Sequence, residues 1–180
     1  ALHSNASPEA RAGQSRGIDL YYFPTSEAGL RMANILADNL RPIYPLPDLV
    51  RALPTLTIGE VRRTRAPSVL AELGYHDNAD DANWLTENLD TIAAALSEGV
   101  TQYFGLPFVT PGTPQTGTVR TGGSSLNLRE YPLADAVVLA EIPNGAQITI
   151  LGGYDSWYTV EYDGLYGFAA AAYISTDAPS

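Results

Sequence analysis

Residues 67–73, with the sequence PSVLAEL, form a nearly continuous apolar run that ends just before Gly74. A run of this kind is typical of a strand that is covered on both faces, in a sheet packed between helices. Glu72 is the one charged residue in the run. The segment therefore predicts a central strand, with Glu72 near its end.

A second strand and a helix are predicted upstream of this run. Residues 17–23 (GIDLYYF) combine Ile18 with three aromatic side chains, which favours a strand that ends at Pro24. Thr25 or Ser26 can cap a following helix that Pro42 stops. Its apolar residues recur at the spacing of one buried face, at Leu30, Ala33, Leu36, Ala37 and Leu40.

A long helix and a linker are predicted downstream. The apolar residues of segment 80–104 follow helical spacing, and Gly105 suits a helix end. The order strand, helix, strand, helix indicates an α/β domain over residues 1–105, with its sheet layered between helices. The stretch 105–117 has three Pro and three Gly without periodicity. Residues 106–116 are therefore predicted to be a linker.

Residues 117–180 have a different pattern. Short segments alternate apolar and polar residues, and turn sequences such as Pro143-Asn144-Gly145 and Asp163-Gly164 separate them. Such strands joined by tight turns are typical of a small barrel. The second part is therefore predicted to be a small all-β barrel.

The composition excludes several classes of function. The chain has 20 acidic and 10 basic residues, and its net charge is −10. Clustered positive charge is what binds a phosphate backbone, so nucleic acid is not an expected partner. The absence of cysteine excludes disulfides, thiolate metal sites and a cysteine nucleophile. No apolar run approaches the roughly 18 residues of a membrane span, so none is predicted.

Glu72 is the sharpest candidate for chemistry. Burying a carboxylate in an apolar strand is costly unless it is paired, solvated at the strand end or facing a metal. Sites in open α/β sheets are built at the ends of strands, which favours a functional role. The alternative, a structural carboxylate paired with Arg62, Arg63 or Arg65, stays open at this point.

The two histidines are weaker candidates when taken alone. His3, next to Ser4 and Asn5, could ligate zinc or carry a proton, although a single histidine at the start of a chain is usually a surface residue. His76 has no partner histidine at the spacing of a helical zinc motif, so we expect a solvated loop residue. The Gly-x-Ser-x-Gly motif is absent, so serine-triad chemistry is not supported.

Four segments occur in an informative order: HSNA (3–6), GIDLYY (17–22), RAPSVLAELGY (65–75) with Asn78, and GVTQYF (99–104). Together they resemble the C-terminal half of the zinc-dependent N-acetylmuramoyl-L-alanine amidases of the type-3 family. The resemblance implies that His3 is a zinc ligand and Glu72 the catalytic carboxylate. Zinc would lower the pKa of its bound water, and the carboxylate would pass the water's proton to the leaving amine.

The sequence departs from this family in its metal ligands. Members open with an Asp-Pro-Gly-His segment and supply a glutamate ligand further along, and neither is present. A catalytic zinc site has three protein ligands, of which this sequence offers His3. We therefore expect a fragment whose other ligands lie upstream of Ala1 or come from a missing N-terminal half. Without that half, the sheet would expose an apolar edge.

The second part carries short patterns at 126–129, 145–151, 157–158, 167–168 and 173–174. Their order resembles a bacterial SH3 domain of the kind found on wall hydrolases, which implies a role in holding the enzyme on peptidoglycan. Most aromatic side chains are expected to fill the core of so small a domain. Trp157, Tyr158 and Tyr166 are the candidates for contact with peptide or sugar at the surface.

These observations and resemblances predict a peptidoglycan amidase that acts outside the cytoplasm, secreted or bound to the cell wall. Zinc-activated water would attack the amide between N-acetylmuramic acid and L-alanine, with Glu72 moving protons and His3 holding zinc. The 180 residues alone are expected to be inactive. Two alternatives stay open: a non-catalytic wall-binding or scaffolding protein with a degenerate amidase fold, and a zinc peptidase that acts on stem peptides.

Overall fold

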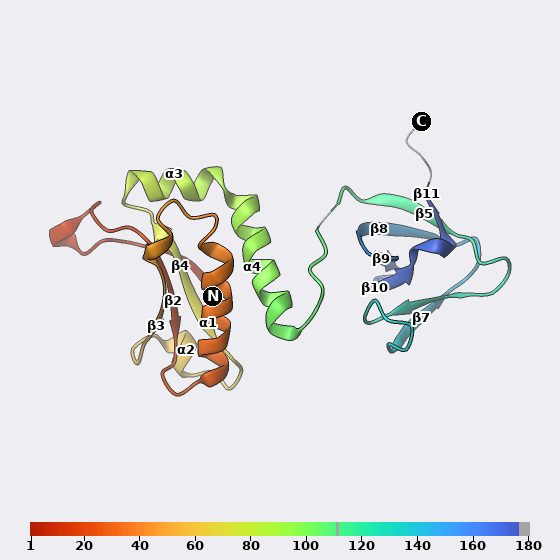
Figure 1. Cartoon of the computed structure of the whole chain (residues 1–180), viewed down its shortest axis with the longest axis horizontal. Helices are drawn as coiled ribbons and strands as arrows, with labels where there is room; N and C mark the ends of the chain where they lie inside the picture. The colour runs from red at the N-terminus through yellow and green to blue at the C-terminus, as the bar shows by residue number, and fades with distance from the viewer. Residues whose placement is uncertain (111, 177–180) are drawn as a thin grey trace. The chain divides into compact units, whose positions relative to one another are not determined.

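The computed structural model describes residues 1–110 and 112–176, and the chain divides into two compact units (Figure 1). We call Ala1–Phe108 the first unit and Val109–Ser180 the second unit. Strand β5 begins at Gln115, and Gly112 donates a backbone hydrogen bond to the Leu151 carbonyl at 3.0 Å. The end of segment 106–116 is therefore hydrogen-bonded to strands of the second unit.

The first unit is built on a four-stranded mixed sheet with the order β1-β4-β2-β3. Strand β4 pairs in parallel with β1 and antiparallel with β2, and β2 pairs in parallel with β3. The strands predicted at 17–23 and 67–73 are confirmed as β2 and β4, whereas β3 is a strand that the pattern does not predict. Their bounds are β1 Leu2–Asn5, β2 Ile18–Tyr22, β3 Val50–Pro54 and β4 Val69–Tyr75.

The first long helix, α1 (Glu27–Leu40), begins where the sequence predicts. The Ser26 hydroxyl accepts a hydrogen bond from the backbone amide of Gly29 at 3.0 Å, so Ser26 is the cap. The predicted apolar face is buried at four positions, and Leu30 is exposed. This face lets α1 pack on the sheet, and the buried positions are Ala33, Leu36, Ala37 and Leu40.

The prediction of a single helix over 80–104 is wrong, because the chain breaks at Asn88. The structure has α3 (Ala79–Glu87) and α4 (Leu89–Phe104), and between them Asn88 leaves the helical region with φ −122° and ψ 22°. The Asn88 side-chain amide donates to the Trp84 carbonyl at 2.9 Å, which stabilises the end of α3. A continuous helix would need Asn88 to keep helical backbone angles.

Helices α1 and α4 lie side by side on one face of the sheet (Figure 1). Their apolar side chains form a core with alternate residues of the strands, among them Leu20 and Ala71. The short helix α2 (Gly59–Arg62) also contacts β4, and its Val61 is buried. None of the helices in the described part of the chain is long and apolar enough to cross a membrane.

The second unit is a seven-stranded antiparallel sheet with the order β11-β5-β8-β9-β10-β6-β7, which confirms the β-rich second part. Among the described residues its edge strands β11 and β7 do not pair, so no closed barrel is detected. Strand β10 meets β6 at a single register position, Phe168 with Arg129. The strands are β5 Gln115–Val119, β6 Leu126–Arg129, β7 Val138–Ile142, β8 Gln147–Tyr154, β9 Trp157–Tyr162, β10 Leu165–Ala170 and β11 Ile174–Thr176.

The predicted turn at Asp163-Gly164 joins β9 to β10. Both residues have positive φ angles, 51° and 76°. Two consecutive positive φ angles are typical of the tight hairpin turn whose twist matches that of paired strands. Asp-Gly is one of the few dipeptides that adopts this geometry at low cost, so the turn fixes the register of the hairpin.

Candidate active site

Four ionisable side chains form one row across the sheet of the first unit. His3 pairs with Glu72, Glu72 with Asp19, and Asp19 with Arg51, each on the neighbouring strand. Directly paired residues share one face of a sheet. Because the residues that alternate with them are buried under α1 and α4, these four residues lie on the opposite face. We call them the polar row.

The polar row brings the two predicted site residues together. The His3 Nδ1 and Glu72 Oε1 atoms are 3.9 Å apart, and the side chains are 46% and 16% exposed, respectively. Among the residues that the structure describes, none of the arginines considered as structural partners of Glu72 forms an ion pair with it. The close partner of Glu72 is therefore a histidine on the edge strand.

The environment of Glu72 favours the protonated carboxyl. Burial raises the pKa of Glu72 above its ordinary value, and positive charge on His3 partly offsets this rise. Among the smaller effects, the Asp19 carboxylate raises the pKa of Glu72 and positive charge on His76 lowers it. The Glu72 Oε2 atom is buried and has no hydrogen-bond partner among the described residues. An unpartnered buried oxygen is costly, and such atoms are often found at functional sites. Glu72 thus has one buried oxygen without a hydrogen-bond partner in the described part of the chain.

Asp19 is a site residue that the sequence interpretation missed. It is buried in β2, and its Oδ1 atom lies 2.7 Å from Nη2 and 2.9 Å from Nε of Arg51. The Tyr21 hydroxyl contacts its Oδ2 atom at 3.4 Å. The signal was available in GIDLYYF, since a carboxylate inside an apolar strand is as unusual there as Glu72 is in PSVLAEL.

His76 follows β4 directly and is exposed, as expected from the sequence. Its Nδ1 atom lies 3.1 Å from the Ser4 hydroxyl, and its backbone amide donates to the Asn5 carbonyl at 2.9 Å. These contacts fix the turn after β4 against the end of β1. His76 is therefore held near Glu72, and its positive charge lowers the pKa of that carboxyl.

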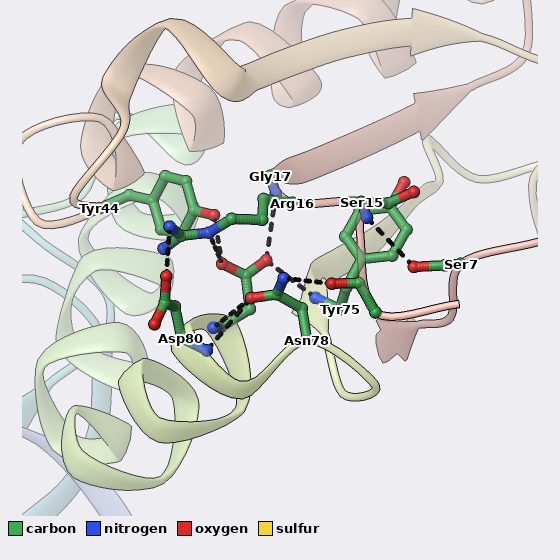
Figure 2. Close-up of polar contacts among 10 residues, drawn as sticks. Ser7, Ser15, Arg16, Gly17, Tyr44, Tyr75, Asn78 and Asp80 are labelled. Carbon is green, nitrogen blue, oxygen red and sulfur yellow. Dashed lines mark hydrogen bonds and ion pairs between the residues drawn. The ribbon is translucent and has the colours of Figure 1, made fainter. Parts of the chain in front are cut away.

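A buried carboxylate supports the end of the sheet beside the polar row. Asp81, in α3, is fully buried, and Figure 2 shows Arg16, Tyr44 and Asp80 converging on this region. It ties together the start of β2, the end of β4 and the first turn of α3. Asp81 accepts four hydrogen bonds, from Nε of Arg16 (3.0 Å), the Tyr44 hydroxyl (2.7 Å) and the backbone amides of Gly17 (3.1 Å) and Tyr75 (3.0 Å).

The loop between β1 and β2 is held by the turn after β4. The exposed Asp77 carboxylate accepts backbone hydrogen bonds from Ser7 (3.0 Å) and Gly13 (2.7 Å). These bonds lower the pKa of Asp77 to about 2. The Asn78 side-chain amide donates to the Gly13 carbonyl at 2.7 Å, as Figure 2 illustrates. The loop is thus fixed at both its start and its middle.

The described residues fit part of a catalytic zinc site and not the whole. The His3 imidazole, 3.9 Å from Oε1 of Glu72, suits a metal ligand beside a general base. In residues 1–110 and 112–176, however, no three His, Cys, Asp or Glu side chains are grouped so that they could hold a metal ion. One ligand is fewer than the three that a catalytic zinc site uses.

In the second unit, the predicted aromatic candidates do not form one cluster. Trp157 and Tyr173 line a pocket of ≈ 390 Å³ with polar side chains such as Arg129. Tyr158 packs against the core, and Tyr166, 66% exposed, is not among the pocket residues. Neighbouring residues of a strand point to opposite faces, which separates Trp157 from Tyr158. Tyr173 is the aromatic residue that the sequence interpretation missed.

Comparison with protein-family models gives two matches. The N-acetylmuramoyl-L-alanine amidase model matches residues 1–102, and the bacterial SH3 domain model matches residues 124–175. A curated relative, the putative N-acetylmuramoyl-L-alanine amidase YrvJ of Bacillus subtilis, is 37% identical over 65 residues. That alignment covers 36% of this chain and 12% of YrvJ.

Solved structures share the fold of the first unit. The CwlD amidase of Clostridioides difficile, solved in complex with the GerS lipoprotein, has a TM-score of 0.52 at 21% identity, over 58% of this chain and 52% of that chain. An N-acetylmuramoyl-L-alanine amidase from Clostridium difficile 630 has a TM-score of 0.50 at 17% identity, over 58% and 55%. The chain thus spans about half the length of these structures. The family match over residues 1–102 shows that this chain belongs to the N-acetylmuramoyl-L-alanine amidase family.

Proposed function

We propose that the chain is part of a peptidoglycan amidase, which hydrolyses the amide between the lactyl group of N-acetylmuramic acid and L-alanine. The observation that carries the proposal is the buried, unpartnered Oε2 atom of Glu72 beside His3, on a sheet of the amidase family. Amide hydrolysis needs a group that takes a proton from water and returns it to the leaving nitrogen. In this proposal Glu72 does both.

Glu72 acts as the proton carrier in this proposal. Its carboxylate takes a proton from the attacking water as the new carbon–oxygen bond forms. The protonated carboxyl then donates that proton to the amide nitrogen as the carbon–nitrogen bond breaks. The products are a carboxylate on the lactyl group and a free amino group on L-alanine. The raised pKa of Glu72 suits the first step, since a more basic carboxylate takes a proton from water more readily.

We propose zinc as the cofactor, with His3 as one ligand and the remaining ligands outside the 180 residues. When bound, zinc would supply the positive charge that makes water a better nucleophile. The chain joined to the sequence that supplies the other ligands is called the extended protein below. Elemental analysis should find about one zinc per extended protein and far less in the 180-residue chain.

The second unit is proposed to hold the enzyme on the cell wall, outside the cytoplasm. Support comes from the bacterial SH3 match and from the pocket that Trp157 and Tyr173 line. Aromatic rings beside polar groups offer a large contact area at low entropy cost, which suits peptide or sugar. Trp157 is therefore the wall-binding residue that we favour among the three predicted candidates.

A second candidate function is wall binding without catalysis. The bacterial SH3 match over residues 124–175 supports it, because such a domain would serve a protein that binds the wall and cleaves nothing. Digestion of purified peptidoglycan with the extended protein separates the possibilities. New amino termini on L-alanine support the amidase, new termini on other residues indicate a peptidase, and no new termini indicate a binding protein.

A further inference from the structure

We propose that a pocket beside the polar row binds a free carboxylate of the substrate's stem peptide. The proposal rests on the proposed amidase function and names a specificity site for it. Among the described residues that line the pocket, three are arginines and none carries a carboxylate. The pocket has a volume of ≈ 340 Å³ and is lined by Arg11, Gln14, Ser15, Arg16, Arg51 and Tyr75.

The three arginines have donors left for a ligand. Arg16 uses Nε and Nη1 on the carboxylates of α3, and Arg51 uses Nε and Nη2 on Asp19. A guanidinium has five N–H donors, so each retains at least one nitrogen without these partners. Arg11 is exposed and forms no ion pair within the described residues. Among the described residues, the pocket is therefore lined by one guanidinium group without a carboxylate partner, that of Arg11, and by two whose positions are fixed by carboxylates.

A carboxylate is the ligand that this arrangement favours. Guanidinium groups bind carboxylates through parallel, charge-assisted hydrogen bonds. The pairing of Arg16 and Arg51 with buried carboxylates fixes both side chains, so little side-chain entropy is lost on binding. Tyr75 adds a hydroxyl donor, because a tyrosine hydroxyl is protonated at neutral pH. Gln14 and Ser15 add neutral polar groups.

The pocket lies at a suitable separation from Glu72. Arg51 stands two strands from Glu72 in the polar row, and neighbouring strands are about 4.8 Å apart, which makes roughly 10 Å between the two backbones. Tyr75, which lines the pocket, lies three residues after Glu72 on β4. One extended peptide residue spans about 3.5 Å. A carboxylate on the residue after L-alanine would thus come within reach of the arginine side chains.

In peptidoglycan, L-alanine is followed by a γ-linked D-glutamate whose α-carboxylate is free in some cell walls and amidated in others. The inference therefore predicts a preference for the free form. The amide keeps the shape of the group and removes its negative charge. Since hydrogen bonds to charged groups are stronger than neutral ones by about 1–2 kcal/mol, the amidated form should bind roughly 10-fold more weakly.

Binding to the 180-residue chain tests this without any hydrolysis. The ligands are N-acetylmuramoyl-L-alanyl-γ-D-glutamyl-L-alanine amide, in which the α-carboxylate of D-glutamate is the only charge, and its isoglutamine counterpart. Titrations followed by ¹H–¹⁵N NMR should give a Kd that is roughly 10-fold lower for the carboxylate form. Arg11→Gln should remove most of this difference and leave the rest of the spectrum unchanged. Arg65→Gln removes the same charge from an exposed site away from the pocket and should keep the difference.

Four results would overturn the proposal. Two concern the ligands themselves: equal affinity for the two, or no binding of either at millimolar concentration. The third is an equal effect of Arg65→Gln and Arg11→Gln on the difference in affinity. The fourth is tighter binding of glycerol phosphate than of the carboxylate form. The last result would assign the pocket to a phosphate of another wall polymer. Because binding is measured apart from cleavage, a lack of amidase activity in the extended protein leaves this test intact.

Discussion

Replacing Asp81 by Asn should destabilise the first unit far more than its small chemical change suggests. Each Asp81 oxygen accepts two hydrogen bonds: Oδ1 from Arg16 and Tyr44, and Oδ2 from Gly17 and Tyr75. In Asn one of these oxygens becomes an NH₂ group, which is a donor. The two hydrogen bonds to that oxygen are then lost. The two groups that donated them are left facing the new NH₂ group, which is itself a donor.

The magnitude follows from the two lost bonds. A hydrogen bond to a charged group contributes about 1.5–3 kcal/mol, so two of them contribute about 3–6 kcal/mol. A second estimate comes from buried ion pairs, because removing one partner of such a pair lowers the free energy of unfolding by about 3–5 kcal/mol. The free energy of unfolding should therefore fall by about 3–5 kcal/mol in Asp81→Asn.

Urea unfolding followed by circular dichroism at 222 nm measures this loss, because the α-helices of the described residues all lie in the first unit. With a slope of about 2 kcal/mol per M, the midpoint should fall by roughly 1.5–2.5 M. Asp80→Asn is the control, since Asp80 is 71% exposed and its ion pair with Arg16 contributes under about 1 kcal/mol. A midpoint for Asp81→Asn within about 0.3 M of the original chain would refute the reasoning.

Two further predictions concern the loop and the second unit. Because its folded pKa is lowered from 3.8 to about 2, Asp77 should support the loop fully above pH 4 and lose that effect as the pH falls through 2. The Gly13 amide resonance should then titrate with a midpoint near pH 2, and a midpoint near pH 4 would contradict the hydrogen bonds. In sedimentation with purified cell walls, Trp157→Ala should bind several-fold less than the original chain, because Trp157 lines the pocket and is a large anchor. Tyr166→Ala should bind normally, and the reverse order would assign wall binding to another face.

Local patterns in the sequence predicted much of the first unit. A run of apolar residues, a proline and a capping serine each report on their immediate neighbours, which is why β2, β4 and the start of α1 were identified correctly. The break at Asn88 was missed because the apolar spacing continues through it. Strand β3 was missed because its five residues, VRALP, contain an exposed Arg51 and a proline. Its strand conformation depends on pairing with β2.

The polar row could not be predicted from spacing. His3 and Glu72 are 69 positions apart and meet because β1 pairs with β4, a non-local contact that no local pattern encodes. Their roles were expected from the family resemblance, while Asp19 was open to the same physical reasoning as Glu72. The arginine pocket depends on a loop, a strand end and an edge strand coming together. Its residues share no periodicity in the sequence.

The most direct test of the proposed mechanism measures how fast the extended protein releases amino termini on L-alanine from peptidoglycan. The rate is compared between the variants Glu72→Gln and Glu87→Gln. Glutamine keeps the shape of Glu72 but cannot accept and return a proton, so kcat should fall roughly 10²- to 10⁴-fold, while zinc content stays unchanged. Glu87 is exposed on α3, so Glu87→Gln should keep the original rate. A Glu72→Gln enzyme with near-normal kcat would contradict the assignment of Glu72 as the proton carrier.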